Sequence, residues 1–409
     1  MSQTENINAL AASQQSLSIG DYINAYFKRM RAGDLGSLPI ILGLMVIAAI
    51  FQTQNENFLT PRNFVNLIVQ MAGITTMAYG VVYVLLLGEI DLSIGYVSAV
   101  AGVSMTLLLR DPGGWPWFAA IPAALLIAAA VGFLHGLIIS TFQVPSFVVT
   151  LAGLLAWNGV VLIIIGGGGT VIIQDKVVIG IANYYLPELW SWIAAALFLL
   201  FFAFTEFQQF NLRRSQGLAN TPATLVVLKV LALTALIGAA VYVANQDRGV
   251  PVIGIILLVF LGGLSFLANR TTFGRYVYAV GGNKEAARRA GISVERIRVI
   301  VFIISSTMAG MGGIILASRL RSVDTAAGGG NLLLNAIAAA VIGGTSLFGG
   351  SGRVSSAVLG ALVIASVENG MGLLGLSSGV KFVVTGLVLL VAVLVDAVSR
   401  RSRAQSGIG

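Results

Sequence analysis

The sequence contains no cysteine and one histidine, and only 10% of its 409 residues are charged. Without cysteine it can form no disulfide, thiolate metal site or cysteine nucleophile. The lone histidine, His135, has no accompanying set of Cys, Asp or Glu ligands, so we expect no metal site there. It lies in Gly132-Phe-Leu-His-Gly136, a spacing of small residues that lets helices approach closely. We therefore interpret His135 as a packing residue.

Motifs for nucleotide binding and catalysis are also missing. The glycine-rich run at residues 343–353 lacks the Lys followed by Ser or Thr that a phosphate loop needs. The run at residues 375–381 is one residue too short, and Phe382 follows its lysine. No paired catalytic carboxylates or Ser-His-Asp grouping lies in a soluble segment. We expect no catalytic residue, no cofactor bound by this chain and no enzymatic activity of its own.

Apolar side chains dominate, at 57% of the sequence. Apolar runs recur along nearly the whole chain, which is typical of a membrane protein rather than a soluble domain. The net charge of +8 does not indicate nucleic acid, because the cations cluster at the ends of apolar segments, as membrane topology requires. We expect an all-α polytopic membrane protein with about 10–12 transmembrane helices, some broken or re-entrant.

The apolar runs and the cations together predict a topology. The expected spans are residues 38–52, 64–87, 92–109, 115–140, 144–165, 189–205, 224–244, 251–268, 297–317, 331–344, 354–374 and 380–398. Twelve crossings with both termini in the cytosol place most of the Lys and Arg residues inside, as the positive-inside rule demands. The domains follow: a cytosolic N-terminal tail at residues 1–36, a single transmembrane domain at 37–398, and a basic cytosolic tail at 399–409.

A basic loop at residues 269–298 interrupts the apolar runs and carries seven Lys or Arg residues. Such a loop is expected in the cytosol. Its middle predicts a short helix: Asn283 can cap the N-terminus, and Glu285 lies in the first turn, where the helix dipole favours an anion. Arg288 falls in the last turn, and Gly291 suits a left-handed C-cap.

Three alanines, Ala286, Ala287 and Ala290, would give this short helix a shallow face. A groove of another protein could approach such a face closely, so the helix could be a docking element. The alternative is an ordinary positive-inside loop that contains one capped turn. The residues alone favour neither interpretation.

Acidic residues also occur inside apolar stretches, where charge is costly and tends to face a cavity, a partner or the interface. Glu89 and Asp91 follow Gly88 and precede Ser93 and Gly95. Glycine on both sides suggests a broken helix that lines a water-filled path. A tight cytosolic turn that holds two solvated carboxylates is equally compatible with the topology.

A later span holds the second acidic candidate, Glu368, next to Asn369 and close to Gly370 and Gly372. These two polar residues are candidates for the interior of the helix bundle. The alternative is a structural hydrogen-bonded pair.

Three motifs resemble those of the permease subunits of bacterial ribose/xylose-type sugar ABC importers. They are Gly-Glu-Ile-Asp-Leu-Ser-Ile-Gly at residues 88–95, Phe-Gly-Arg-Tyr through Val-Glu-Arg at 273–296, and Ala-Ile-Ala-Ala-Ala-Val-Ile-Gly-Gly-Thr-Ser-Leu-Phe-Gly-Gly at 336–350. The resemblance covers most of the chain beyond the N-terminal tail. It is greatest to the D-xylose permeases, through residues 144–153 and an additional pair of spans around residues 213–247.

The resemblance implies a homodimeric permease in the bacterial cytoplasmic (inner) membrane, which passes D-xylose or a related monosaccharide inward by alternating access. A periplasmic sugar-binding protein would deliver the sugar, and a separate ABC ATP-binding subunit would hold ATP and Mg and dock on the cytosolic face. The residues that it assigns to this coupling are Gly281, Gly282, Asn283, Glu285, Ala286, Ala287, Arg288 and Gly291. Those expected along the translocation path are Glu89, Asp91, Ser93, Gly95, Gly343, Gly344, Thr345, Glu368 and Asn369.

Two rival functions are compatible with parts of the sequence. An ion- or proton-coupled secondary transporter could use Glu89, Asp91 and Glu368 as a relay, but it would need no docking loop for an ATPase. A structural membrane scaffold fits the composition but leaves the costly acids without a role.

Overall fold

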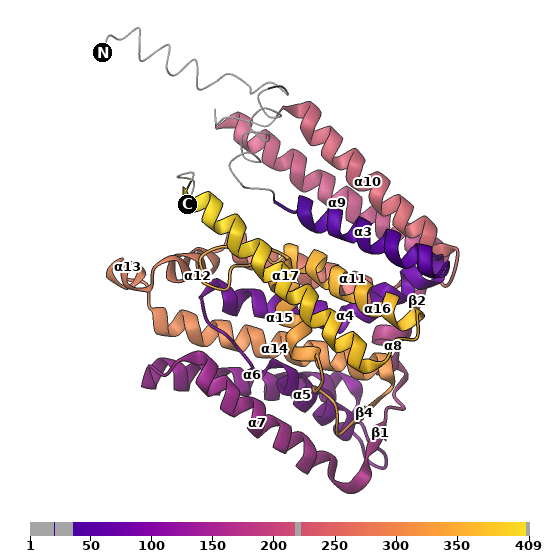
Figure 1. The fold of residues 1–409 in the computed structure, drawn as a ribbon, viewed down its shortest axis with the longest axis vertical. Coiled ribbons are helices and arrows are strands. Elements are labelled where there is room, and N and C mark those ends of the chain that lie inside the picture. The colour runs from indigo at the N-terminus through magenta and orange to yellow at the C-terminus, as the bar shows by residue number, and fades with distance from the viewer. Residues whose placement is uncertain (1–19, 21–35, 217–221, 406–409) are drawn as a thin grey trace. The chain divides into compact units, whose positions relative to one another are not determined.

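The computed structural model describes residue 20 and residues 36–216 and 222–405. Apart from residues 20 and 36, the predicted N-terminal tail lies outside the described residues, as do residues 217–221 and the last four residues of the predicted basic tail. The structure is built almost entirely of helices (Figure 1). They are α3 (Leu38–Gln54), α4 (Pro61–Leu86), α5 (Ile94–Leu108), α6 (Trp117–Phe142), α7 (Ser146–Ile165), α8 (Lys176–Asn183), α9 (Glu188–Ser215), α10 (Ala223–Asn245), α11 (Val252–Arg270), α12 (Thr272–Gly282), α13 (Lys284–Arg289), α14 (Val294–Leu320), α15 (Leu332–Ile342), α16 (Ser356–Leu373) and α17 (Ser378–Gln405).

The strands are very short. They are β1 (Thr170–Ile172), β2 (Tyr185–Leu186), β3 (Val250–Pro251) and β4 (Ser322–Asp324), and β1 pairs antiparallel with β4. Among the described residues, eight helices are long and apolar enough to cross a membrane, and four more apolar helices are shorter. The predicted all-α polytopic membrane fold is therefore confirmed.

The chain divides into two compact units, which we describe separately. The smaller unit includes Leu186–Val250 and is built around helices α9 and α10. Lys229 on α10 forms an ion pair of 2.6 Å with Glu206 on α9, and its ammonium lies 5.3 Å from the centre of the Phe202 ring. Most apolar side chains of these two helices are exposed, as is expected of helices that face lipid.

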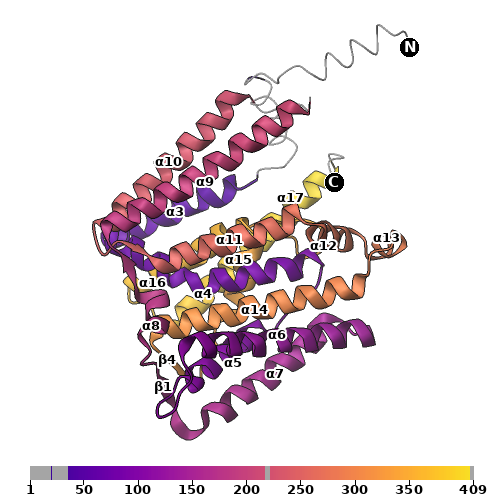
Figure 2. The ribbon, with the colours of Figure 1, turned by 180° about the vertical axis from the view of Figure 1, so that it is seen from behind.

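The larger unit comprises Gly36–Tyr185 and Pro251–Val398. Its centre is the antiparallel pair α4 and α14, which lie side by side in both ribbon views (Figures 1 and 2). Glycines bring the two backbones together: a Cβ added at Gly80 would lie 2.9 Å from the Cα of Ser305. Without a hydrophobic force between helices in lipid, such small residues allow the close packing that holds the bundle together.

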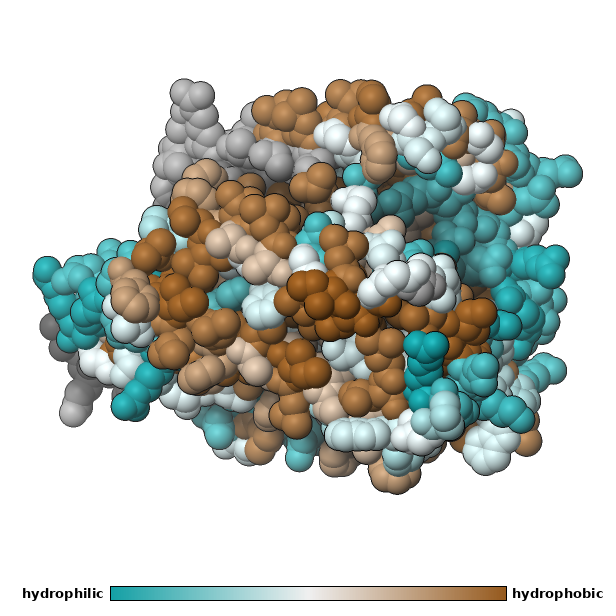
Figure 3. Space-filling view, turned by 90° about the horizontal axis from the view of Figure 1, so that it is seen from below, coloured by the Kyte–Doolittle hydropathy of each residue, from teal (hydrophilic) through white to brown (hydrophobic). Residues whose placement is uncertain are grey.

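Other helices of the larger unit cover this central pair. Helices α5 and α6 pack on α14, and α15 and α16 pack on α4. The face seen from the side of α6 and α7 is mostly hydrophobic, with hydrophilic residues gathered toward its two ends (Figure 3). This distribution fits a protein whose middle lies in the hydrocarbon core and whose ends reach water.

The break between α4 and α5 is where the sequence predicts it. Helix α4 ends at Leu86, Gly88 has a φ of +70° that favours glycine, and α5 begins at Ile94. The backbone groups released by the break find partners, since the amide of Ile90 donates to Ser146 Oγ at 3.2 Å. Non-helical backbone within a bundle is stable only when its polar groups are satisfied in this way.

Candidate functional site

Two polar cavities lie at opposite ends of the α4–α14 pair. The first adjoins the start of α14, near Arg298, and the second adjoins its end, near Arg319. At 1.5 Å per residue, the helix rises about 30 Å between these two arginines, which is the thickness of the hydrocarbon core. The two cavities are therefore separated along the bundle by about the thickness of a hydrocarbon core. We call them the Glu89 cavity and the Glu368 cavity.

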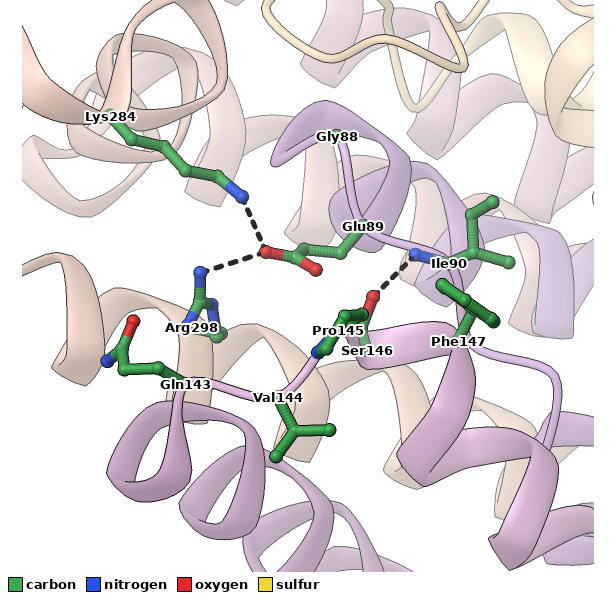
Figure 4. Close-up of a pocket in the computed structure, with 10 residues that line it drawn as sticks. All are labelled: Gly88, Glu89, Ile90, Gln143, Val144, Pro145, Ser146, Phe147, Lys284 and Arg298. Carbon is green, nitrogen blue, oxygen red and sulfur yellow. Dashed lines mark hydrogen bonds and ion pairs between the residues drawn. The ribbon is translucent and has the colours of Figure 1, made fainter.

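The Glu89 cavity has a volume of about 320 Å³. Its lining residues are Gly88, Glu89, Ile90, Gln143, Val144, Pro145, Ser146, Phe147, Lys284 and Arg298 (Figure 4). Lys284 Nζ lies 2.7 Å and Arg298 Nη2 3.0 Å from the same oxygen, Glu89 Oε1. Glu89 is buried, so it is neither a solvated carboxylate in an open turn nor a free proton acceptor.

Opposing effects act on the pKa of Glu89. Burial raises it, but hydrogen bonds from Lys284 and Ser146 and the charge of Arg298 outweigh burial, so the pKa lies below its ordinary value. Glu89 therefore remains ionised and paired at neutral pH. The paired carboxylate joins the α4–α5 break to two later segments, α13 and the start of α14, that are about 200 residues away in the sequence.

Helix α13, which supplies Lys284, is capped as the sequence predicts. The Asn283 side chain accepts a hydrogen bond of 2.9 Å from the amide of Ala286. At the other end, Gly291 has a φ of +83°, and the amide of Ile292 donates to the Ala287 carbonyl at 3.0 Å. This is the Schellman arrangement. The predicted short helix within the basic loop is therefore confirmed.

The charged residues of α13 lie on its exposed side. Arg288 contacts Glu285 at 3.5 Å and Glu295 at 3.0 Å, and Arg289 contacts Glu285 at 3.2 Å. The prediction of a shallow face of three alanines is wrong for Ala287, which is buried, whereas Ala286 and Ala290 are exposed. The residue turns inward because a six-residue helix packed on a bundle must bury one side.

A cluster of glycines fixes the segment before α13 to the end of α4. A Cβ at Gly281 would overlap the carbonyl oxygen of Leu86 and would lie 2.7 Å from the amide nitrogen of Gly350. That amide donates to the same Leu86 carbonyl at 2.9 Å. A Cβ at Gly349 would in turn lie 2.9 Å from the amide of Gly88. Gly282 is different, because a Cβ there would meet nothing within 4 Å.

Of the other residues predicted to line a path with Glu89, three lie near the end of α15 and one lies at the start of α5. Gly343, Gly344 and Thr345 lie at the C-terminal end of α15, where a Cβ at Gly343 would overlap the Ser356 backbone. Gly343 and Thr345 are buried in the close-packed region, whereas Gly344 is exposed, and none of the three lines either cavity. Gly95 lies in the first turn of α5, where a Cβ would be 2.7 Å from the Gly328 carbonyl oxygen.

Asp91 and Ser93 belong to a buried hydrogen-bonded chain. Ser93 Oγ donates to Asp91 Oδ1 at 2.6 Å, and Ser305 Oγ donates to Asp91 Oδ2 at 3.3 Å. Trp157 Nε1 donates to His135 Nε2 at 3.1 Å. The other ring nitrogen, Nδ1, must then carry the proton and faces Ser93 Oγ at 3.4 Å. His135 packs within the bundle, as predicted, and also connects α6 and α7 to the break.

The Glu368 cavity is larger, about 600 Å³. Its lining residues are Asn63, Asn66, Gln70, Ile74, Leu316, Arg319, Asn331, Leu332, Asn335, Glu368, Asn369, Gly372, Leu373, Ser378, Lys381 and Phe382. Both predicted residues of the later span, Glu368 and Asn369, lie here. Glu368 Oε1 accepts from Asn335 Nδ2 at 2.6 Å, and Asn369 exchanges hydrogen bonds of 2.8 and 3.0 Å with Asn63.

Most amides of this cavity were missed by the sequence reasoning. Asn63, Asn66 and Gln70 are spaced i, i+3 and i+7 along an otherwise apolar helix, and Asn331 and Asn335 are spaced i and i+4. Residues with this spacing share one helix face. Amide side chains on one face of a membrane helix were the signal that could have found this cavity.

The broken helices, the small-residue packing and the polar cavities define a membrane permease, since discontinuous helices around polar sites are the architecture of transport proteins. Residues 63–393 match the model of a family described as "Branched-chain amino acid transport system / permease component". The chain belongs to this family.

Several curated relatives are similar over nearly their whole length. The xylose transport system permease protein of Escherichia coli (strain K12) is 38% identical over 92% of this chain and 95% of its own. The corresponding protein of Haemophilus influenzae is 33% identical over 91% of this chain and 99% of its own. The ribose import permease protein of Escherichia coli (strain K12) is 32% identical over 87% and 92%. No solved structure matches the chain.

Proposed function

We propose that this chain is the membrane-spanning permease subunit of an ATP-driven importer of xylose or a related monosaccharide. The similarity to xylose and ribose permeases over nearly their whole length supports the class of substrate. The observation that carries the mechanism is the Glu89 ion pair. It links α13, on one face of the bundle, to the break between α4 and α5, so that a displacement of α13 moves the broken helix.

In this proposal the α13 end faces the cytosol, with both termini, and a separate ATP-binding subunit docks on α13. The seven cations of residues 269–298 favour that orientation. The exposed residues available for docking are Gly282, Asn283, Glu285, Ala286, Arg288, Arg289, Ala290 and Gly291. A periplasmic sugar-binding protein would engage the opposite end, next to the Glu368 cavity.

Two copies of the chain would form the transporter. This part of the proposal depends on the resemblance of the sequence motifs to homodimeric permeases. Light scattering of the purified protein tests it: a mass of two chains is expected, and a monodisperse single chain would contradict it.

The geometry disfavours a relay of Glu89, Asp91 and Glu368. Glu89 is held by two cations, Asp91 accepts from two serines, and Glu368 lines the cavity at the other end of the bundle. A proton relay needs carboxylates within reach of one another or of a connecting chain. The three acids have separate partners and separate surroundings.

The test is uptake of radiolabelled xylose and ribose by a deletion strain that expresses the chain with its ATP-binding and sugar-binding partners. Uptake should stop when ATP is depleted and should persist when the proton gradient is collapsed. An inactive ATP-binding subunit is the matched control. Uptake that follows the proton gradient, or that persists without the ATP-binding subunit, would contradict the proposal.

A further inference from the structure

Asn335, which lines the Glu368 cavity, has a buried amide oxygen without a hydrogen-bond partner among the described residues. Asn335 is 3% exposed, and its Nδ2 donates to Glu368. Its Oδ1 accepts no hydrogen bond from any of the described residues. A buried acceptor without a donor costs free energy, so a ligand that brings a hydroxyl or amine donor to this oxygen would remove that cost.

The neighbouring amides are held in fixed orientations. Asn369 Nδ2 donates to Asn63 Oδ1 at 3.0 Å and to Gln70 Oε1 at 3.1 Å. Asn63 Nδ2 donates back to Asn369 Oδ1 and to the Phe58 carbonyl, both at 2.8 Å. These bonds order the side chains before any ligand arrives, which lowers the entropic cost of binding. The wall is therefore preorganised rather than a set of mobile surface groups.

The chemistry of the wall selects the kind of ligand. An amide carries both donors and acceptors, and a hydroxyl also does both, so six amides around one cavity suit a molecule with several hydroxyls. Ile74, Leu316 and Phe382 add apolar surface for the C–H face of such a molecule. The volume of about 600 Å³ lies within the range of roughly 300–1,000 Å³ usual for small-molecule sites.

We propose that the Glu368 cavity binds a neutral monosaccharide in transit, with Asn335 Oδ1 accepting from one hydroxyl and Glu368 accepting from another. This inference rests on the proposed function and adds to it the place and the chemistry of the contact. Arg319 and Lys381 also line the cavity and would favour an anion instead. The Glu368 carboxylate would repel an anion. The six neutral amides do not favour an anion over a neutral molecule.

Thiol protection tests the site directly, because the chain has no cysteine of its own. Ser378→Cys places one sulfur on the cavity wall, and Ser377→Cys places one on the adjacent exposed residue outside it. In membrane vesicles that hold the complete transporter, a thiol-reactive label on this chain is quantified by mass spectrometry. D-xylose should slow labelling of Ser378→Cys and leave Ser377→Cys unchanged.

Uptake kinetics give a second readout. Asn335→Leu should raise the half-saturating xylose concentration on the order of tenfold, the loss expected for one hydrogen bond to the ligand. The matched control is Asn245→Leu, because the Asn245 amide also has no partner in the described structure but lies on α10 in the smaller unit. The control should leave the half-saturating concentration unchanged.

The outcomes separate this inference from the proposed function. Equal labelling of Ser378→Cys with and without xylose, in a transporter that still imports xylose, overturns the inference and leaves the proposed function in place. Protection by D-xylonate but not by D-xylose also overturns it, in favour of an anion site. Absence of ATP-dependent uptake by the unaltered chain removes the proposed function and this inference together. If Asn335→Leu does not accumulate in the membrane, the thiol experiment decides alone.

Discussion

The two ends of the α4–α14 pair hold polar residues of different kinds. At the α13 end, one buried carboxylate is neutralised by two cations, at 2.7 and 3.0 Å, within a cluster of close-packed glycines. At the opposite end, amides surround a cavity about twice as large, and one of their oxygens has no partner among the residues that the structure describes. At the α13 end the buried charged groups pair with one another. At the Glu368 end a hydrogen-bond acceptor remains that no described residue uses and that a ligand could use.

This difference fits two separate roles, in which the α13 end transmits movement and the Glu368 end binds the sugar. Ion pairs and backbone contacts without free volume transmit a displacement, because close-packed groups cannot move independently. A neutral sugar instead needs hydrogen bonds that form and break easily. The following predictions test whether the two ends differ in this way.

The largest effect is expected from Glu89→Ala. The change leaves Arg298 buried beside a vacated carboxylate site, and breaking a buried ion pair from one side costs about 3–5 kcal/mol. The melting temperature of the purified protein should fall markedly, and xylose uptake should be lost. Lys284→Ala is the matched control, because the Lys284 side chain is 43% exposed and an exposed pair contributes only about 0–1 kcal/mol. Equal destabilisation by both changes would show that Glu89 is not the centre of a buried cluster.

The sequence predicts the two ends unequally well. The capped α13 and the break at Gly88 are local features, set by a capping side chain, a helix dipole and glycine conformations, and both predictions are confirmed. The pairing of Glu89 with Lys284 joins residues 195 positions apart, and no local pattern specifies such a pairing. For the same reason the sequence left open whether Glu89 faces a path or a solvated turn.

The burial of individual small residues was the second feature that the sequence could not predict. Ala286 and Ala287 are identical in chemistry, and only the docking of α13 on the bundle decides that Ala287 is buried. The Glu368 cavity is an intermediate case. Its two residues in the later span were predicted as interior groups, but it also depends on amides from α4 and α15 that helical spacing alone could have grouped. The contact between those helices follows from the tertiary fold.

A smaller effect is expected from Gly281→Ala. The added Cβ would overlap the Leu86 carbonyl oxygen and displace the Gly350 amide that donates to it. Overpacking of this kind costs roughly 1–3 kcal/mol, and a loosened junction should lower uptake more than ATP hydrolysis by the assembled transporter. Gly262→Ala, on α11 and outside the proposed docking segment, is the control, because a Cβ there meets open space. If the ratio of uptake to hydrolysis is the same in both variants, the glycine junction does not transmit movement from α13.

The smallest effect concerns the pH dependence of the Glu89 cluster. The pKa of Glu89 is lowered in the folded protein, so its ionised form stabilises the fold at any pH above the unfolded value of 4.5. This contribution is lost only as the pH falls through the lowered folded pKa. The difference in melting temperature between the unaltered protein and Glu89→Ala should therefore stay constant from neutral pH down to about 4.5 and shrink in more acidic buffer. A difference that instead grows as the pH falls from neutral toward 4.5 would mean that burial raises the folded pKa of Glu89 and outweighs the two cations, and the two ends would then not differ as proposed.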